Sequence, residues 1–288
     1  MNPRYAPQNG VSALVISYNE EVNIERALRS LQLVSDDIWL IDSESTDRTV
    51  EIAESLGVNV VVRPWPGYVN QWNYALSELP LQHPYVLLLD ADEEIPEAWA
   101  AELRDVLEQP SPPDMIQTRF RFWWMGKPVE HGQYGKAWVT RVGRRELMRY
   151  EEREVNEHIP LQGEVYQMKT PYEHYDAKNV AFWLKKHIRY ALLETIEREK
   201  AREEINSYQP RLFGGGQSDR VLWLRQNVYD RLPPLMRPMA YFLYRYVLGM
   251  GWRDGLTGTF FHILHGFWFP LLMDIFEKER ELQRKGRL

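Results

Sequence analysis

The sequence contains no cysteine. Disulfide bonds, thiolate metal ligands and cysteine nucleophiles are therefore excluded, and the composition is compatible with a reducing compartment. The sequence also lacks a glycine-rich dinucleotide fingerprint and a P-loop, so a Rossmann dehydrogenase and a P-loop kinase are both disfavoured.

An excess of basic residues is missing as well. Lys and Arg number 35 against 41 Asp and Glu, a net charge of −6, so no global field attracts nucleic acid and no such partner is expected. No apolar run is long and clean enough to indicate a membrane span. The first ten residues are polar, without the apolar core of a secretory signal. We therefore expect a cytoplasmic protein.

Strands and helices are predicted to alternate along the first hundred residues. Short apolar runs typical of buried strands occupy residues 11–17, 37–41, 58–62 and 86–92. Segments with helical spacing of apolar residues lie between them, at 24–31, 48–56 and 69–78. This spacing favours a right-handed, doubly wound and mostly parallel sheet of the α/β class.

Polar residues gather where three of these strands end, in the segments 17–20, 42–47 and 90–94. In open α/β sheets ligands bind at the carboxyl ends of the strands. Asp90 and Asp92, one residue apart, could hold a hard divalent cation through oxygen. The alternative is a capped loop, because acidic residues are common before a helix and Ile95-Pro96-Glu97 is typical of a helix start.

Four segments keep a characteristic order, spacing and placement at strand ends: Ile16–Glu21, Ile41–Thr49, Gln71–Leu76 and Leu89–Glu93. With them, residues 12–94 resemble family 2 glycosyltransferases of the GT-A (nucleotide-diphospho-sugar transferase) fold. The chain looks closest to the lipopolysaccharide-core β-glucosyltransferase-like branch, and that likeness continues past residue 150.

The resemblance implies a nucleotide-sugar pocket, with Asp42 against the uracil or ribose. Its residues are expected to be Ser17, Tyr18, Asn19, Glu20, Asp42, Gln71, Asn73, Asp90, Ala91 and Arg141. Arg141 falls where this branch places an arginine that can meet the diphosphate in bidentate fashion. Trp72 stands where relatives often carry Lys or Arg, so a diphosphate contact from that position is not expected.

For the cofactor, the resemblance implies Mg²⁺ or Mn²⁺ held on the diphosphate by Asp90 and Asp92. His174 is expected to contact the diphosphate or to complete the metal site; an Asp, Asp, His set suits Mn²⁺ better than oxygen ligands alone. Such a cation would stabilise the charge that develops on the departing nucleotide diphosphate.

The general base of an inverting transferase is a carboxylate opposite the leaving group. In this branch an acidic residue, usually preceded by His, occupies that site, which points to Glu157; here Asn156 replaces the His. Glu154 is the main rival, and His158 is a further alternative.

The remaining segments are less regular. Residues 116–124 alternate as one strand, and Met125-Gly126-Lys127-Pro128 resembles a hairpin turn. A helix is expected over 179–208, and the glycines at 214–216 indicate a hinge or loop.

We place the domain boundary between a catalytic domain, 1–208, and a helical extension, 209–288. In the extension, residues 236–252 and 259–276 are largely apolar and aromatic, with Pro270 bending the second segment. Such segments fit helices lying in a bilayer interface, which would place the protein peripherally on the inner face of the plasma membrane. Packing on the catalytic domain or forming a homo-oligomer interface is the alternative.

Together these features predict a metal-dependent, inverting glycosyltransferase. The expected donor is a UDP-sugar, with glucose as the leading guess, and the expected acceptor a membrane-associated glycolipid or lipopolysaccharide precursor joined in β-linkage. Two other classes stay open: a phosphatase of the haloacid-dehalogenase type, which also begins from Asp-x-Asp after a strand, and a non-catalytic membrane-associated scaffold on a transferase fold.

Overall fold

The computed structural model describes residues 10–151, 159–204, 223–224 and 227–287. The chain divides into two compact units: unit 1 comprises Met1–Trp123 and Tyr134–Ala177, and unit 2 comprises Trp124–Gln133 and Lys178–Leu288. This division differs from the domain boundary after residue 208 that we placed from the sequence. The helix α5 (Val180–Glu204) groups with unit 2 because it packs along α9 (Phe269–Arg284), where the Thr195 hydroxyl lies 3.4 Å from the Met273 carbonyl oxygen.

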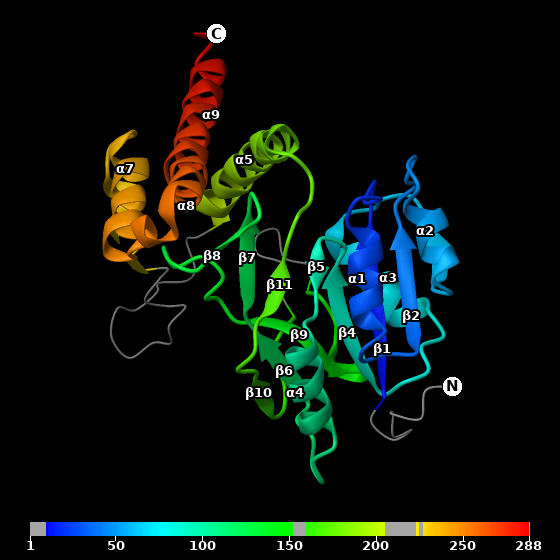
Figure 1. Ribbon diagram of the computed structural model, residues 1–288. Helices are drawn as coiled ribbons and strands as arrows, with labels where there is room; N and C mark the ends of the chain where they lie inside the picture. The colour runs from blue at the N-terminus through cyan, green and yellow to red at the C-terminus, as the bar shows by residue number, and fades with distance from the viewer. Residues whose placement is uncertain (1–9, 152–158, 205–222, 225–226, 288) are drawn as a thin grey trace. The chain divides into compact units, whose positions relative to one another are not determined.

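Unit 1 is built on a seven-stranded sheet (Figure 1). Its strands, in chain order, are β1 (Val11–Ser17), β2 (Asp37–Asp42), β3 (Asn59–Val62), β4 (Tyr85–Asp90), β6 (Met115–Thr118), β9 (Val139–Arg144) and β10 (Val165–Gln167). Their spatial order is β10-β6-β9-β4-β1-β2-β3. The four N-terminal strands run parallel, and β9 is antiparallel to both of its neighbours.

Helices cover both faces of this sheet. Alternate residues of β1 point to opposite sides: Ala13 and Val15 pack in one buried cluster, whereas Leu14 and Ile16 pack in another. The first cluster includes side chains of α1 (Ile24–Leu31), α2 (Thr49–Ser55) and α4 (Glu97–Leu107). The second includes side chains of α3 (Tyr68–Glu78). The predicted doubly wound, mostly parallel sheet is thereby confirmed.

A second sheet has four short strands, in the order β5-β11-β7-β8. They are β5 (Glu93–Glu94), β7 (Phe120–Trp124), β8 (Lys127–Val129) and β11 (Tyr172–His174). The prediction of one strand over 116–124 was wrong, because the chain leaves the large sheet after Thr118. The buried Thr118 hydroxyl meets the Trp99 indole N–H and the Thr170 carbonyl oxygen there. The predicted turn is confirmed, with Met125 and Gly126 both at positive φ.

Unit 2 is helical. After η2 (Tyr229–Arg231) come α7 (Met236–Leu243), η3 (Tyr244–Leu248), η4 (Gly251–Asp254), α8 (Gly255–Phe261), η5 (His262–Trp268) and α9. The predicted helical character of the two apolar segments is confirmed, and Pro270 lies at the start of α9. Within the described residues, one helix, Gly251–Arg284, is long and apolar enough to cross a membrane by length and composition, and 33% of its most apolar window is buried.

Buried polar contacts hold unit 2 together. Asp254 accepts a hydrogen bond from the backbone N–H of His131 and contacts the rings of His131 and His262, at 2.6 and 3.2 Å. Arg245 donates from Nε to the Gly132 carbonyl oxygen at 2.8 Å. Gly132 is at φ +71°, and a Cβ there would lie 2.2 Å from the His262 ring, so only glycine allows this close approach.

Candidate active site

The loops after β1 and β2 are locked together by hydrogen bonds. Ser17 donates to the carboxylate of Asp42 at 2.7 Å, and the backbone N–H and hydroxyl of Ser45 donate to the same carboxylate at 2.7 and 2.6 Å. Asp42 has no exposed surface. In this arrangement the Asp42 carboxylate holds the ends of β1 and β2 together. For Asp42 to contact a base or ribose, the Ser45 hydroxyl would have to move away from the carboxylate.

Asn19 links the same two loops. Its backbone N–H donates to the Ser45 hydroxyl, and its side-chain oxygen accepts from the Thr46 N–H, both at 2.8 Å. Asn19 takes φ +53°, a conformation that asparagine tolerates better than most residues. Tyr18 beside it is 58% exposed. An exposed aromatic ring at the carboxyl edge of the sheet is available to stack on a base.

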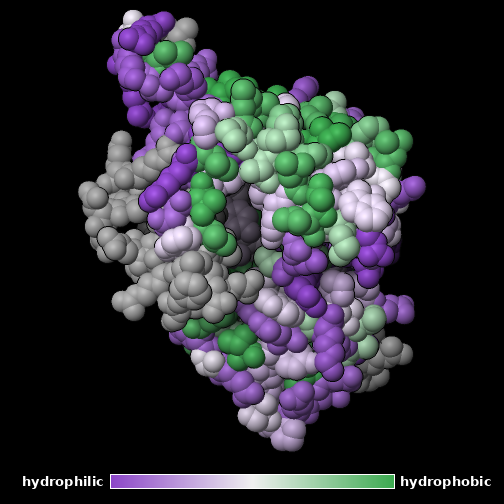
Figure 2. Space-filling view, turned by 90° about the vertical axis from the view of Figure 1, so that its left-hand side faces the viewer, coloured by the Kyte–Doolittle hydropathy of each residue, from purple (hydrophilic) through white to green (hydrophobic). Residues whose placement is uncertain are grey.

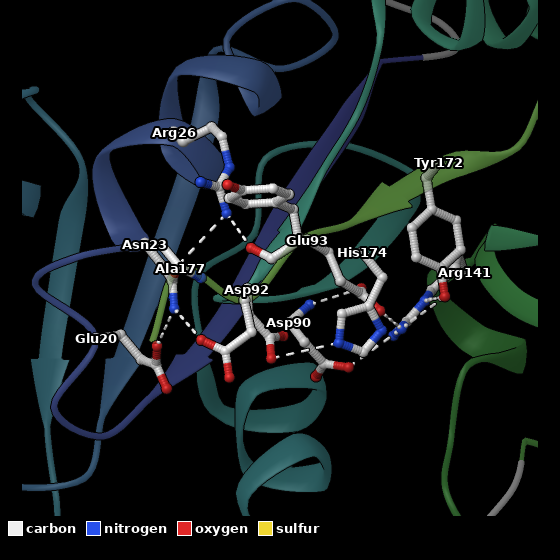
Figure 3. Close-up of polar contacts among 12 residues, drawn as sticks. Glu20, Asn23, Arg26, Asp90, Asp92, Glu93, Arg141, Tyr172, His174 and Ala177 are labelled. Atoms are coloured by element: carbon white, nitrogen blue, oxygen red, sulfur yellow. Dashed lines mark hydrogen bonds and ion pairs between the residues drawn. The ribbon is translucent and has the colours of Figure 1, made fainter. Parts of the chain in front are cut away.

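Glu20 anchors the start of α1 rather than standing free. Its carboxylate accepts from Asn23 Nδ2 at 2.8 Å, and the same amide group reaches Asp176 at 3.1 Å. Asn23 also accepts from the backbone N–H of Ala177. Figure 3 shows these contacts joining α1 to the chain that follows β11.

The two predicted residues of α3 face inward. Gln71 is fully buried and donates to the Ser43 hydroxyl at 3.2 Å. Asn73 makes a pair of hydrogen bonds with the backbone of Tyr150, at 3.0 and 2.9 Å. Asn73 therefore fixes the backbone at Tyr150. Glu154, Asn156, Glu157 and His158 themselves lie outside the described residues.

Asp90, at the end of β4, pairs with Arg141 of β9. Arg141 is 6% exposed and donates to Asp90 Oδ2 at 3.1 Å, to Glu93 and to the Tyr172 hydroxyl at 3.1 Å. Glu93 also accepts from the backbone N–H of Asp90 at 3.0 Å, closing the turn after β4. The side chain of Ala91 packs in the core, so any contact with a sugar would come from its backbone.

Asp92 faces His174, with His174 Nε2 3.4 Å from Asp92 Oδ2 (Figure 3). The cause is strand pairing: His174 of β11 is opposite Glu93 of β5, and the Tyr175 N–H donates to the Asp92 carbonyl oxygen at 2.9 Å. Phe120 and Phe122 flank the His174 ring, with centroids at 5.6 and 5.4 Å. Both the position and the orientation of the imidazole are thereby set.

Burial and charge shift the pKa values of this cluster. Burial raises the pKa of Glu93 to about 7, against the lowering influence of Arg141. Burial alone would lower the pKa of His174, but the adjacent Asp92 carboxylate, with Glu93 and Asp90 behind it, raises the pKa to about 9. The site thus draws positive charge toward Asp92.

The donor chemistry suits a divalent cation that shares its coordination with a substrate. Within the described ranges, no three His, Asp or Glu side chains are grouped closely enough to hold a metal by themselves. Asp90, predicted as a ligand with Asp92 and His174, pairs with Arg141, and its role as a metal ligand stays a prediction. Asp92 and His174 place two donor groups side by side, which fits a cation completed by phosphate oxygens and water.

Sequence reasoning did not assign site roles to Glu93, Tyr172, Tyr68 or Tyr150. Tyr68 and Tyr150 pack edge to face at 5.6 Å, and burial followed by the charge of Asp90 raises the pKa of Tyr68. The sequence did point to Glu93, because this glutamate directly follows Asp90-Ala91-Asp92 at the end of the predicted strand. The tyrosines had none, since they reach the site only through packing.

The comparisons agree with this geometry. The model of glycosyl transferase family 2 matches residues 12–163, more than half of the chain, which therefore belongs to this family. A protein described as an uncharacterized glycosyltransferase from Rickettsia bellii is 47% identical over 98 residues, which cover 34% of this chain and 31% of that protein. The chain thus spans about a third of the length of the curated relatives it matches.

Solved structures give the fold. A mannosyltransferase from Pyrobaculum calidifontis, in complex with GDP-mannose and Mn²⁺, matches 98% of this chain and 88% of its own, with a TM-score of 0.52 and 17% identity. Glucosyl-3-phosphoglycerate synthase from Mycobacterium tuberculosis, solved with Mn²⁺ and UDP, matches 48% of this chain and 58% of its own, with a TM-score of 0.37 and 20% identity. The likeness to the mannosyltransferase, together with the family match, shows a fold of the GT-A type.

Proposed function

We propose that this glycosyltransferase uses Mg²⁺ or Mn²⁺ to transfer a hexose, with glucose as the leading candidate, from a UDP-sugar to a glycolipid acceptor with inversion. The observation that carries the proposal is the pairing of Asp92 with His174 at 3.4 Å beside Asp90 and Arg141, at the carboxyl end of β4. Carboxylates, an imidazole and a buried guanidinium together suit a pyrophosphate bound through a cation.

In this reaction the acceptor hydroxyl oxygen forms a bond to the anomeric carbon while the bond from that carbon to the diphosphate oxygen breaks. The electron pair leaves with the nucleoside diphosphate. A bound cation would neutralise the charge that develops there. Arg141 holds Asp90 in place, and the buried Glu93 fixes Arg141, so the charged groups are oriented before the donor arrives.

The acceptor proton goes to a carboxylate on the side opposite the leaving group, and Glu157 is our candidate for this base. Direct displacement on an α-linked donor gives a β-glycoside.

The resemblance to the lipopolysaccharide-core branch supports a glycolipid acceptor. The nucleotide is less closely specified by the fold, because a neighbour of similar architecture is in complex with GDP-mannose. UDP and GDP donors therefore have to be compared directly, together with the sugars that each carries.

Titration calorimetry with UDP and with GDP, each with and without Mn²⁺, tests the proposal. We expect UDP to bind with an affinity that depends on Mn²⁺, and UDP-glucose to stabilise the protein against heat. A scaffold would bind neither nucleotide in a metal-dependent way, and a phosphatase would release inorganic phosphate without a sugar acceptor. Tight GDP binding with no UDP binding would overturn the choice of donor. NMR of the anomeric proton of the product tests inversion.

A further inference from the structure

Unit 2 exposes an unusual set of large apolar side chains between α7 and η5. Each is at least 41% exposed. They are Leu235, Met236, Met239, Leu243, Tyr244, Val247, Leu248, Met250, Trp252, Leu256, Phe260 and Ile263, which we call the apolar face. Figure 2 looks toward α7 and α8 and shows hydrophobic residues gathered over the upper part of this side, beside the polar end of α9. Soluble proteins rarely expose apolar side chains in such concentration without a partner.

The polar groups of the same helices are turned inward. Arg237 of α7 pairs with Asp274 of α9 at 3.2 Å, and their side chains are 8% and 5% exposed. Arg245 is 2% exposed and donates to the Gly132 carbonyl oxygen and the His265 ring. A helix that faces water places its charges outside and its apolar residues inside. These helices do the reverse, so their outer side is suited to an apolar environment.

The charge of the apolar face is positive. Between residues 235 and 273 the sequence has three arginines and one acidic residue, Asp254. The Asp254 side chain is 3% exposed and contacts the rings of His131 and His262. Arg245 and Arg237 are buried, so Arg253 is the exposed charged residue of this segment. This contrasts with a net charge of −6 for the whole chain.

We propose that the apolar face binds the surface of a lipid bilayer that carries anionic headgroups. Leu248 and Leu256, at 75% and 70% exposure, would enter the acyl boundary. Tyr244 and Trp252 are of the types that favour the headgroup level, and Arg253 would meet lipid phosphates. The protein lies on the membrane rather than crossing it, because α9, the second half of the long apolar helix, carries a dense run of charges after Phe276.

A second copy of the chain fits the same face less well. In a two-fold interface a face meets itself, so Arg253 would approach its own kind, and Glu130, the exposed carboxylate of the adjoining segment, is balanced by the exposed Lys127. Anionic lipid supplies the missing negative charge. Binding to a bilayer and binding to a second copy can be told apart by experiment, because only binding to a bilayer depends on the charge of the lipid headgroups.

Sedimentation with vesicles tests this proposal without nucleotide or acceptor, so the result is independent of the sugar-transfer reaction. We expect the full chain to sediment with vesicles of phosphatidylcholine and phosphatidylglycerol, less with phosphatidylcholine alone, and less again in high salt. The double variant Leu248→Ser/Leu256→Ser should reduce the partition coefficient about tenfold or more. Arg253→Gln should reduce binding to the anionic vesicles about fivefold and leave binding to phosphatidylcholine unchanged.

Leu161→Ser is the matched control, because Leu161 is 53% exposed but belongs to unit 1. It should sediment like the wild type. Circular dichroism and melting curves establish that each variant is folded. Substitutions at exposed positions are expected to leave the fold intact.

The proposal is overturned if folded wild type stays in the supernatant with both vesicle types, or if the double variant sediments equally well. A dimer in analytical ultracentrifugation that the double variant dissociates, without vesicle binding, would assign the face to a second copy. Resistance to alkaline extraction from membranes would indicate a span instead.

Discussion

The two units of this molecule differ in what they expose. Both bury ion pairs, but unit 1 gathers carboxylates at its strand ends, whereas unit 2 exposes large apolar side chains. The pKa values of His174 in unit 1 and His265 in unit 2 are shifted in opposite directions. Asp92 raises the pKa of His174 to about 9 despite burial, while burial and then Arg245 hold the pKa of His265 well below its usual value. One unit is organised to attract cations and the other to exclude water.

The largest effect on activity is expected at the proposed base. Glu157→Gln should lower kcat by about 10²–10⁴-fold and leave nucleotide affinity unchanged, because the amide cannot accept the acceptor proton. Steady-state transfer and UDP titration measure the two quantities. Glu154→Gln is the matched variant and should transfer at close to the wild-type rate. If Glu154→Gln is the inactive one, the base has been assigned to the wrong residue.

Asp92→Ala should reduce kcat/KM by about 10²–10³-fold and remove the Mn²⁺ dependence of UDP binding, since the carboxylate facing His174 is lost. Calorimetry with Mn²⁺ and UDP checks this directly. Asp105→Ala, at an exposed position of α4, serves as the control. Neither variant should alter binding to vesicles. A loss of vesicle binding in Asp92→Ala would break the separation of roles between the units.

Breaking the buried pair of unit 2 should cost stability rather than chemistry. Arg237→Met leaves the Asp274 carboxylate buried without its partner, a loss of about 3–5 kcal/mol. Urea unfolding followed by tryptophan fluorescence measures it. The double variant Arg237→Met/Asp274→Leu should recover much of that loss, because neither charge of this pair is then buried. Arg231→Met, at an exposed arginine of the same unit, should change stability by less than about 0.5 kcal/mol. Equal costs for Arg237→Met and Arg231→Met would show that the pair contributes little.

The smallest effect expected is on the pH dependence of stability, measured without metal. The pKa of His265 is lowered in the folded state, so the unfolded chain binds the proton more tightly and stability falls as the pH drops through about 6.5. The pKa of His174 is raised to about 9, so its contribution is fully present below 6.5 and is lost as the pH rises through about 9.

Melting temperatures across this range should therefore separate the two histidines. His265→Gln should flatten the acid side of the profile, although His262, whose pKa burial also lowers, keeps part of that slope. His174→Gln should flatten only the alkaline side. A variant that flattens the opposite side would contradict the assigned direction of its pKa shift.

Much of unit 1 was predictable because its signals are local. The apolar run 85–89 followed by Asp90 and Asp92 indicates a buried strand that ends in acids, whatever the rest of the chain does. The same local reasoning failed at residues 116–124. Ile116, Phe120 and Phe122 keep an even spacing across Arg119, so the pattern cannot show that the chain changes sheets there.

The sequence by itself determined the parallel sheet, the edge at which the acids gather and the apolar character of the last helices, because each depends on neighbours a few residues apart. The tertiary structure decided which groups meet. Arg141 reaches Asp90, and His174 reaches Asp92, only because β9 lies beside β4 and β11 pairs with β5. The direction in which unit 2 turns its arginines was likewise decided by helix packing. Strand order, register and packing join residues far apart in the chain, and no local period encodes them.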